Sequence, residues 1–165
     1  MPQDFEEVYA QHLGPVWRYV SARVSARADA EDLTSEVFAR ALRAWGRYDE
    51  RRGSAGAWLM GIAHHVVADW WRRAGREMAV EQMDAAVGAS PDPGPEASAL
   101  AGEAREELRR HMERLTDRER DAVALRFGGG LRAAEVGAAL GVSETAARML
   151  VYRAVSKLRE VMAVE

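Results

Sequence analysis

One stretch, residues 133–152, constrains the fold more than any other; it reads AAEVGAALGVSETAARMLVY. Val136 and Leu140 are four residues apart, as on one face of a helix, and Gly141 follows where a helix is expected to end. Ser143 can then cap a second helix. This spacing predicts a helix-turn-helix. The buried face expected for its second helix consists of Ala147, Leu150, Val151, Ala154 and Leu158.

The opposite face of this second helix is expected to be exposed, polar and cationic. It carries Glu144, Arg148, Tyr152, Arg153 and Lys157. A short helix, a glycine turn and a second helix with outward cations can place that second helix in the major groove of DNA. The segment therefore predicts a unit that reads duplex DNA.

Charge is distributed unevenly along the chain. The formal net charge of −3 is low for a protein that grips DNA unaided, because phosphate contacts need Lys and Arg. Residues 81–104 contain five acidic residues and no Lys or Arg, and residues 90–95 (SPDPGP) hold three of the five prolines. This composition is typical of a linker. The pattern indicates a DNA binder that works with a larger partner.

We therefore predict an all-α protein made of two small helical domains. The first covers residues 1–79 and the second residues 99–165, and an acidic, proline-rich, flexible linker at residues 80–98 joins them. No internal repeat and no convincing strand run occurs in the sequence.

The first domain is expected to begin with two amphipathic segments. Apolar residues recur at helical spacing from Phe5 to Val20, and Gly14-Pro15 leaves open one kinked helix or two short ones. Asp29 is predicted to cap the next helix. Its buried seam is expected to hold Leu33, Val37, Ala41 and Trp45, with Phe38 near the edge and Asp32, Glu36, Arg40 and Arg43 on the other side.

An aromatic and cationic segment follows. Residues 46–54 (GRYDERRGS) form a polar loop that is either an ordinary surface loop or one that holds an unstacked base. Residues 57–76 (AWLMGIAHHVVADWWRRAGR) form an apolar helix with a cationic end and three of the five Trp residues. Core packing explains some of these rings. A strip that stacks bases and neutralises phosphates of single-stranded DNA is the functional interpretation.

The second domain begins with a predicted amphipathic helix whose apolar positions run from Leu100 to Leu115. Thr116 and Glu119 then form the pattern of a capping box for the next helix, in which Val123 and Phe127 are expected to be buried. Three glycines at 128–130 end it before the helix-turn-helix.

Several classes of protein are excluded by what the sequence lacks. The chain has no Cys, and the adjacent His64 and His65 lie about 100° apart on a helix without a third ligand nearby, so no metal or other cofactor is expected. No nucleophile–base pair and no phosphate-binding glycine loop is recognisable, so the protein is predicted not to be an enzyme. Neither a signal peptide nor a membrane span is apparent, which favours a cytoplasmic protein.

Taken in order, three motifs resemble one known family. DAEDLTSEVFARAL is similar to region 2.2, RGSAGAWLMGIAHHVVADWWRR to regions 2.3 and 2.4, and LTDRERDAVALRF with the helix-turn-helix to region 4 of the extracytoplasmic-function (ECF, group 4) sigma factors of the sigma-70 family. The resemblance covers nearly the whole chain. It implies a sigma factor that binds core RNA polymerase and directs promoter-specific initiation under control of an anti-sigma protein. It also implies a monomer when free.

The resemblance implies roles for individual positions. Those matching the helix that docks on the polymerase clamp helices are Asp32, Leu33, Glu36 and Phe38. Those matching the loop and helix that meet the melted, single-stranded −10 element are Tyr48, Arg51, Arg52, Trp58, Ile62, His65, Arg72 and Arg73. Those matching the helix that enters the duplex −35 major groove are Ser143, Glu144, Thr145, Arg148, Met149, Leu150 and Arg153, of which the arginines are expected to reach phosphates or guanine edges.

The sequence also departs from this family's pattern. Relatives usually have Arg-Asn in place of His64-His65, and that Asn often helps to hold the flipped base. They often have Ser-Arg in place of Met149-Leu150. Gly137 replaces a common Ala and is expected to weaken its helix by up to about 1 kcal/mol. These departures leave the promoter sequence open.

Two alternatives remain on the sequence alone. A stand-alone helix-turn-helix regulator would normally dimerise on a palindrome and would need neither the Trp-rich helix nor the acidic linker. An enzyme centred on His64, His65 and Asp69 is the other.

Overall fold

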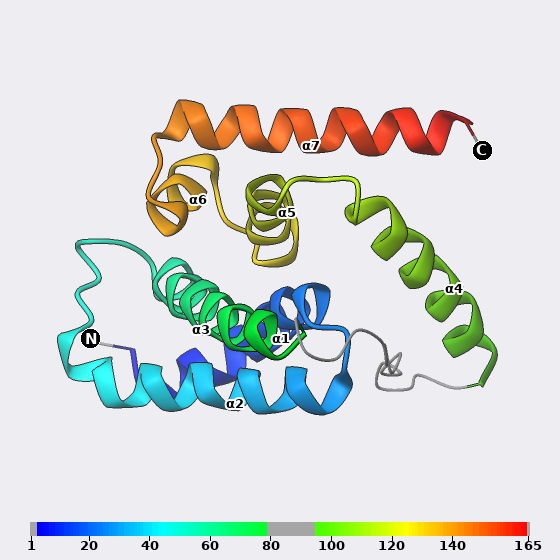
Figure 1. Ribbon diagram of the computed structural model, residues 1–165. Coiled ribbons are helices and arrows are strands. Elements are labelled where there is room, and N and C mark those ends of the chain that lie inside the picture. Colours follow the sequence, from blue (N-terminus) through cyan, green and yellow to red (C-terminus); the bar gives the residue numbers. More distant parts are fainter. Residues whose placement is uncertain (1–2, 79–94, 165) are drawn as a thin grey trace.

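The computed structural model describes residues 3–78 and 95–164, and every regular element in those two ranges is helical. Two layers of helices lie one on the other (Figure 1). The first contains α1 (Phe5–Arg23), α2 (Arg27–Ala44), the short 3-10 helix η1 (Trp45–Arg47) and α3 (Ala55–Met78). The second contains α4 (Pro95–Met112), α5 (Asp117–Val123), the π-helical turn η2 (Ala124–Gly128), α6 (Ala133–Leu140) and α7 (Glu144–Val164). The predicted all-α fold is confirmed.

The N-terminal layer begins with one continuous helix, which settles the alternative left open at Gly14-Pro15. Pro15 lies inside α1, while Val8 and Val16 on the buried face are fully inaccessible. Tyr9 and Leu13 were expected in the same apolar stripe, but they are 43% and 37% exposed. The buried stripe of α1 therefore contains fewer residues than the apolar stripe that the sequence pattern predicted.

Helix α2 begins earlier than predicted. Its N-cap is Ala26, so Asp29 lies in the first turn, where its charge still favours the helix dipole. Leu33, Val37 and Ala41 are buried as expected. Phe38 was expected near the edge, but it is only 6% exposed because its ring packs edge-on against Tyr9 at 4.7 Å between centroids.

The capping box at the start of α5 is confirmed. The Thr116 hydroxyl accepts a hydrogen bond from the Glu119 amide at 3.2 Å, and the Glu119 carboxylate accepts one from the Thr116 amide at 3.0 Å. These bonds satisfy two donors that a helix start would leave free. The expected burial of Phe127 is wrong: the π-helical turn η2 carries this side chain outward and leaves it 61% exposed.

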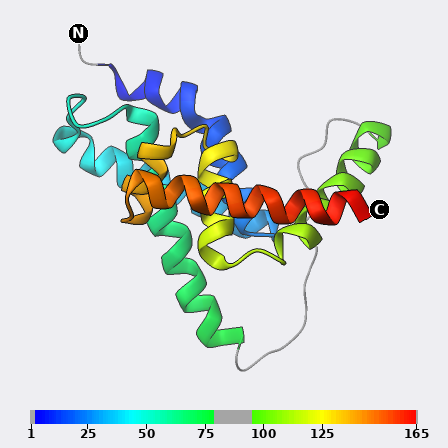
Figure 2. The same ribbon diagram turned by 90° about the horizontal axis from the view of Figure 1, so that it is seen from above.

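Helix α4 lies toward the C-terminal end of α7, to one side of the other helices (Figures 1 and 2). Leu108 is 52% exposed, and Ala104 is exposed as well, whereas Leu115 is buried with Val123 and Met112 packs against them. The apolar stripe predicted for this segment is therefore buried only at its C-terminal end. Most of the predicted linker, residues 80–94, lies outside the described residues. Its last four positions, 95–98, are part of α4.

The helix-turn-helix is formed as predicted. Gly141 ends α6 with φ of 70°, in the left-handed region that glycine adopts without strain. The Ser143 hydroxyl accepts a hydrogen bond from the Ala146 amide at 3.1 Å at the start of α7. Gly137 lies so close to this turn that an added Cβ would meet the Val142 carbonyl oxygen at 2.8 Å. The alanine that is common at this position in the family would therefore have no room here.

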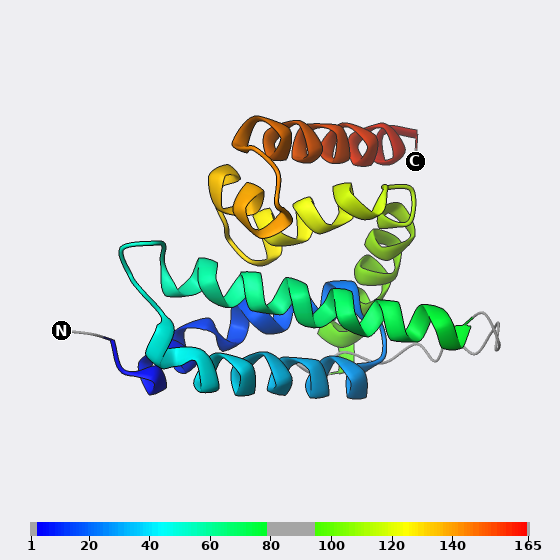
Figure 3. The ribbon, with the colours of Figure 1, turned by 60° about the vertical axis from the view of Figure 1, so that its left-hand side comes forward.

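The two layers share one hydrophobic core. Leu125, Leu131 and Val136 of the second layer belong to the same buried cluster as Tyr19 and Met60 of the first. The glycines after α5 permit this approach: an added Cβ on Gly129 would lie 2.7 Å from the Met60 sulfur. Figure 3 shows α5 and α6 seated above α1 and α3.

Candidate nucleic-acid interface

Three aromatic rings support the loop that precedes α3. The Tyr48 ring stacks on Trp45 with 5.0 Å between centroids and 12° between planes, and it lies 5.2 Å from the Trp58 ring. The Tyr48 hydroxyl donates a hydrogen bond to the Gly53 carbonyl at 2.9 Å. Burial, with the nearby Glu50 and Asp49 carboxylates, raises the pKa of Tyr48 and keeps this donor protonated. This hydrogen bond therefore holds the loop closed against the three aromatic side chains.

The cations of this loop point into solvent. Arg51 forms an ion pair with Asp49 at 3.1 Å although its own side chain is 87% exposed. Hydrogen bonds from Arg51 hold the pKa of Asp49 below its usual range. Arg52 is exposed and forms no ion pair within the described parts of the chain. Arg52 can thus bind an anion from solvent directly, whereas Arg51 can do so only after its ion pair with Asp49 breaks.

A mixed stripe follows along α3. Trp58, Ile62, His65 and Arg72 recur at helical spacing, so they lie on one face of the helix. Trp58 and Ile62 are half-buried against the core, whereas His65 and Arg72 are exposed. Arg73 is also exposed beside this stripe. The stripe therefore runs from aromatic and apolar groups near the loop to cations near the C-terminal end of α3.

The Asp69 carboxylate partly neutralises the positive charge at the C-terminal end of this stripe. Its carboxylate accepts a hydrogen bond from Arg72 and lies 3.5 Å from the Arg40 guanidinium of α2. Arg40 in turn pairs with Glu36 at 2.8 Å. This network connects the outer face of α2 with the end of α3.

The two adjacent histidines face different surroundings. His64 is turned toward α1, where its Nδ1 lies 3.2 Å from the Tyr19 hydroxyl oxygen, and burial lowers its pKa. His65 is exposed. In the described ranges, no group of three His, Asp or Glu side chains is placed to hold a metal ion. Only His65 of the pair therefore belongs to the outward stripe.

The start of α7 presents the second set of predicted residues. Ser143, Glu144, Thr145, Arg148 and Arg153 are exposed, and Met149 is 44% exposed. Arg148 donates a hydrogen bond to Glu144 at 2.6 Å. Leu150 instead packs against the hydrophobic core, so it supports the helix rather than facing outward.

Lys157, which the sequence pattern placed on the exposed face of α7, keeps 42% of its side chain exposed but turns its ammonium group toward α5. Its ammonium group lies 2.8 Å and 3.1 Å from the two carboxylate oxygens of Glu119, which is only 4% exposed. Burial alone would raise the pKa of Glu119, but hydrogen bonds from Lys157 and Thr116 outweigh it, and the pKa is lowered. Lys157 thus ties α7 to the capping box of α5.

The outer face of α2 holds the remaining predicted site. Asp32 is exposed, and Glu36 is partly exposed with a pKa lowered by its hydrogen bond from Arg40. Leu33 and Phe38 are buried, so of the four predicted residues only the two acids offer polar atoms to a partner. Leu42, on the same helix, is 59% exposed and was not predicted. A single exposed apolar side chain of this kind has no recognisable pattern in the sequence.

Two family models match the chain. The model described as "Sigma-70 region 2" covers residues 8–77, and the one described as "Sigma-70, region 4" covers residues 111–160. Curated relatives include the ECF RNA polymerase sigma factor SigD of Mycobacterium tuberculosis, which is 34% identical over 149 residues covering 88% of this chain and 70% of SigD. The RNA polymerase sigma factor CarQ of Myxococcus xanthus is 32% identical over 162 residues, covering 96% of this chain and 88% of CarQ.

This chain belongs to the ECF sigma factors. The ECF RNA polymerase sigma factor BldN of Streptomyces coelicolor is also similar to this chain, with 35% identity over 158 residues that cover 96% of this chain. The chain spans 60% of the length of BldN. The aromatic loop and the α3 stripe fall within region 2 of the sigma factor, and the start of α7 falls within region 4.

Solved structures share the fold of this sigma factor. The sigma factor RpoE of Bartonella quintana, solved in complex with the anti-sigma factor NepR, aligns over 99% of both chains with a TM-score of 0.80 and 20% identity. CnrH, solved in complex with the cytosolic domain of CnrY, aligns over 98% of this chain and 88% of its own with a TM-score of 0.73 and 20% identity.

Proposed function

We propose that this ECF sigma factor binds core RNA polymerase, directs it to a promoter through two separate DNA contacts, and is held inactive by an anti-sigma protein. The observation that carries the proposal is the pairing, in one chain of this family, of an aromatic-to-cationic stripe on α3 with an exposed polar helix start at α7. Each surface suits a different form of DNA.

The region around α3 is proposed to hold the melted −10 strand. A flipped base costs a few kcal/mol of stacking, which a ready aromatic support and nearby cations can offset. Tyr48 and Trp58 supply the aromatic support, and Arg52 supplies an exposed cation beside it. Ile62, His65 and the exposed Arg72 and Arg73 continue the path along α3, while Arg51 joins when it leaves Asp49.

The start of α7 is proposed to enter the −35 major groove. Arg148 and Arg153 are the residues expected to reach guanine edges or phosphates, because both are exposed on the outward face. Ser143, Glu144, Thr145 and Met149 surround them, and Leu150 fixes the helix from behind.

Helix α2 is proposed to dock on the polymerase clamp helices through Asp32 and Glu36. The buried Leu33 and Phe38 hold these two acids in place by anchoring the opposite face of the helix. The acidic net charge of −3 fits a protein whose DNA contacts act on a larger platform.

Control by an anti-sigma protein is proposed from family membership and from the exposed apolar side chains. Such side chains occur on both layers, and an occluding partner would cover them: Tyr9, Leu13, Leu42, Phe127 and Met162 are each at least 37% exposed. None of the helices that the structure describes combines the length and apolar character that a bilayer span requires. We further propose a cytoplasmic, monomeric, non-enzymatic protein that uses no cofactor.

Reconstituted transcription tests the proposal. Purified protein is added to core RNA polymerase with a library of promoter fragments, and runoff transcripts are sequenced. We expect transcripts that start at a shared position downstream of a −35 and a −10 element, and none with core enzyme alone. A protein that shifts duplex DNA tightly by itself and yields no transcript would instead be the stand-alone helix-turn-helix regulator.

A further inference from the structure

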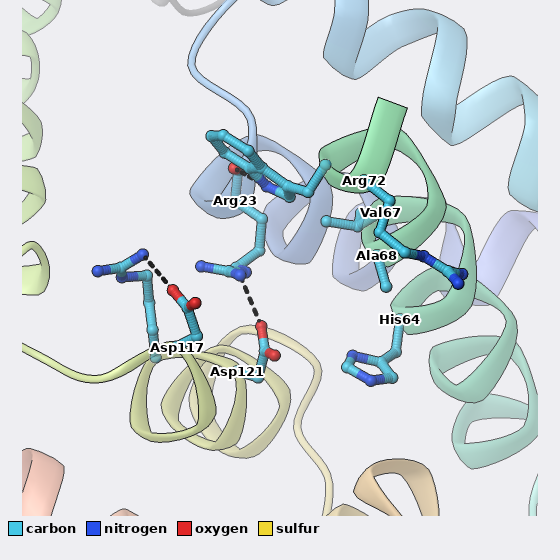
Figure 4. Close-up of a pocket in the computed structure, with 9 residues that line it drawn as sticks. Arg23, His64, Val67, Ala68, Arg72, Asp117 and Asp121 are labelled. Carbon is cyan, nitrogen blue, oxygen red and sulfur yellow. Dashed lines mark hydrogen bonds and ion pairs between the residues drawn. The ribbon is translucent and has the colours of Figure 1, made fainter. Parts of the chain in front are cut away.

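A buried ion pair joins the two layers of the molecule. The Arg23 guanidinium at the end of α1 lies 2.8 Å from the Asp121 carboxylate of α5, and the two side chains are only 8% and 17% exposed (Figure 4). Arg23 belongs to the region 2 match and Asp121 to the region 4 match, so the pair crosses between the two DNA-reading units. Neither residue belongs to a surface proposed to contact DNA or polymerase.

Further contacts position this pair. The Trp71 indole of α3 donates a hydrogen bond to the Arg23 carbonyl at 3.1 Å, which fixes the end of α1 against α3. The pair lines a cavity of about 390 Å³ bounded by α1, α3 and α5, with His64 on its α3 side. Near the other end of the interface, Ser54 donates a hydrogen bond to Glu135 of α6 at 3.3 Å.

The polar part of this interface is not fully satisfied. The Arg23 Nε atom is buried and has no hydrogen-bond partner in the part of the chain that the structure describes. A buried donor without an acceptor opposes burial, and an open cavity beside it leaves part of the surface unpacked. Beside the shared hydrophobic core, this polar part of the contact therefore has the imperfect pairing and packing of an interface between domains.

The closed arrangement conflicts with the proposed use of the two surfaces. Elements centred at −35 and −10 are about 25 base pairs apart, or about 85 Å along B-form DNA at about 3.4 Å per base pair. The N-terminal end of α3 touches α6 through Ser54 and Glu135, so the two surfaces are packed side by side. Both elements cannot be read at once until the layers separate.

We propose that the Arg23–Asp121 pair is an intramolecular latch that keeps the free protein closed, and that the promoter-binding form requires its release. The consequence for binding rests on the function proposed above. When only a fraction of the free protein is open, its apparent affinity for polymerase falls by that fraction. Loss of the latch should therefore strengthen polymerase binding rather than weaken it.

Distance measurement in the free, full-length chain tests the latch directly. Because the chain contains no cysteine, Ser35→Cys in α2 and Arg159→Cys in α7, both exposed, give two sites for spin labels. We expect one short, narrow distance distribution with Asp121 present. Asp121→Arg should shift it to longer, broader distances, and the charge swap Arg23→Asp with Asp121→Arg should restore it.

Two further variants control for charge and folding. Asp117→Asn removes an exposed carboxylate one turn earlier in α5 and should leave the distances unchanged. Asp121→Asn keeps the side-chain shape and should also lengthen the distance. It replaces Asp121→Arg in the test if helical circular dichroism shows that the arginine variant does not fold. An unchanged distribution in folded Asp121→Arg or Asp121→Asn protein would overturn the latch.

Polymerase affinity of the unlabelled proteins separates this proposal from the one on which it rests. We expect Asp121→Arg to bind core polymerase at least tenfold more tightly than the parent, and the charge swap to return toward the parent value. A parent that does not bind polymerase at all refutes the proposed function, while the distance shift still supports the latch. Normal polymerase binding with unaltered distances refutes the latch alone.

Discussion

At the scale of single residues, the environment of a side chain can reverse what its sequence position indicates. Lys157 follows the spacing of the outward face of α7, yet it pairs with Glu119 because α5 packs against that side of the helix. Periodicity within one helix does not contain the position of a neighbouring helix. The capping box that holds Glu119, in contrast, is a local pattern and was predictable.

Glu119→Gln is expected to lower the free energy of unfolding by about 1–3 kcal/mol at pH 7, because it removes a charged hydrogen-bond acceptor that is buried. The pKa of Glu119 is lowered in the folded protein, so its stabilising effect is complete above the unfolded-state pKa near 4.5 and is lost as pH falls through the folded-state value. Urea unfolding at pH 7 and pH 3.5 measures both. The exposed Glu160→Gln is the matched control, and a parent–variant difference independent of pH would contradict the assignment.

Gly137→Ala is expected to destabilise the protein although alanine is the better helix former. The propensity gain is at most about 1 kcal/mol, whereas forcing a Cβ to 2.8 Å from the Val142 carbonyl oxygen costs about 1–3 kcal/mol of overpacking. Thermal unfolding measures the net loss. Gly61→Ala in α3, where an added Cβ meets no atom of the described residues within 4 Å, should instead stabilise; a gain at both positions would show that the turn yields freely.

At the scale of elements, the sequence predicted the presence of helices more reliably than it predicted where they start and which of their side chains are buried. The helix-turn-helix and the capping box were correct because each depends on a few adjacent residues. The exposure of Phe127 and Leu108 was missed, since a π-helical turn redirects one and α4 lies to the side of the main packing. The N-cap of α2 lies three residues before the predicted Asp29, because the actual cap, Ala26, makes no side-chain hydrogen bond that the sequence could reveal.

Arg148→Ala is expected to weaken holoenzyme binding to a duplex −35 element by about 1–3 kcal/mol while leaving opening of the −10 element unchanged. The guanidinium is exposed and held near the start of α7 by Glu144 at 2.6 Å. Fluorescence anisotropy with −35 and −10 fragments measures the two steps separately. Arg159→Ala, about 16 Å further along the same helix, should change neither, and equal losses on both fragments would contradict the role given to Arg148.

At the scale of the whole molecule, the two-unit division was predictable but the contact between the units was not. The acidic, proline-rich segment marks the division in the sequence. Arg23, Asp121 and the glycines at 128–129 gave no comparable signal, because they gain meaning only when α5 lies on α1 and α3. The candidate site was likewise predicted as two separate surfaces, without the packing that brings them together.

Heat should unfold the free protein in one transition, because a continuous buried cluster spans both layers. Scanning calorimetry tests this by comparing the calorimetric and van't Hoff enthalpies, which should agree. Asp121→Arg is expected to separate the profile into two transitions, since the layers then unfold independently. Two transitions in the unaltered protein would show that the shared core is too weak to couple them.

The position of Asp121 has a genetic consequence. It lies outside the residues assigned to either promoter element and outside the α2 face assigned to polymerase, and its partner Arg23 is equally remote from them. A change in that single codon would preserve every recognition contact while enlarging the pool of sigma factor that competes for polymerase. Such an allele would behave as a gain of function and would raise expression of the whole regulon without altering any promoter.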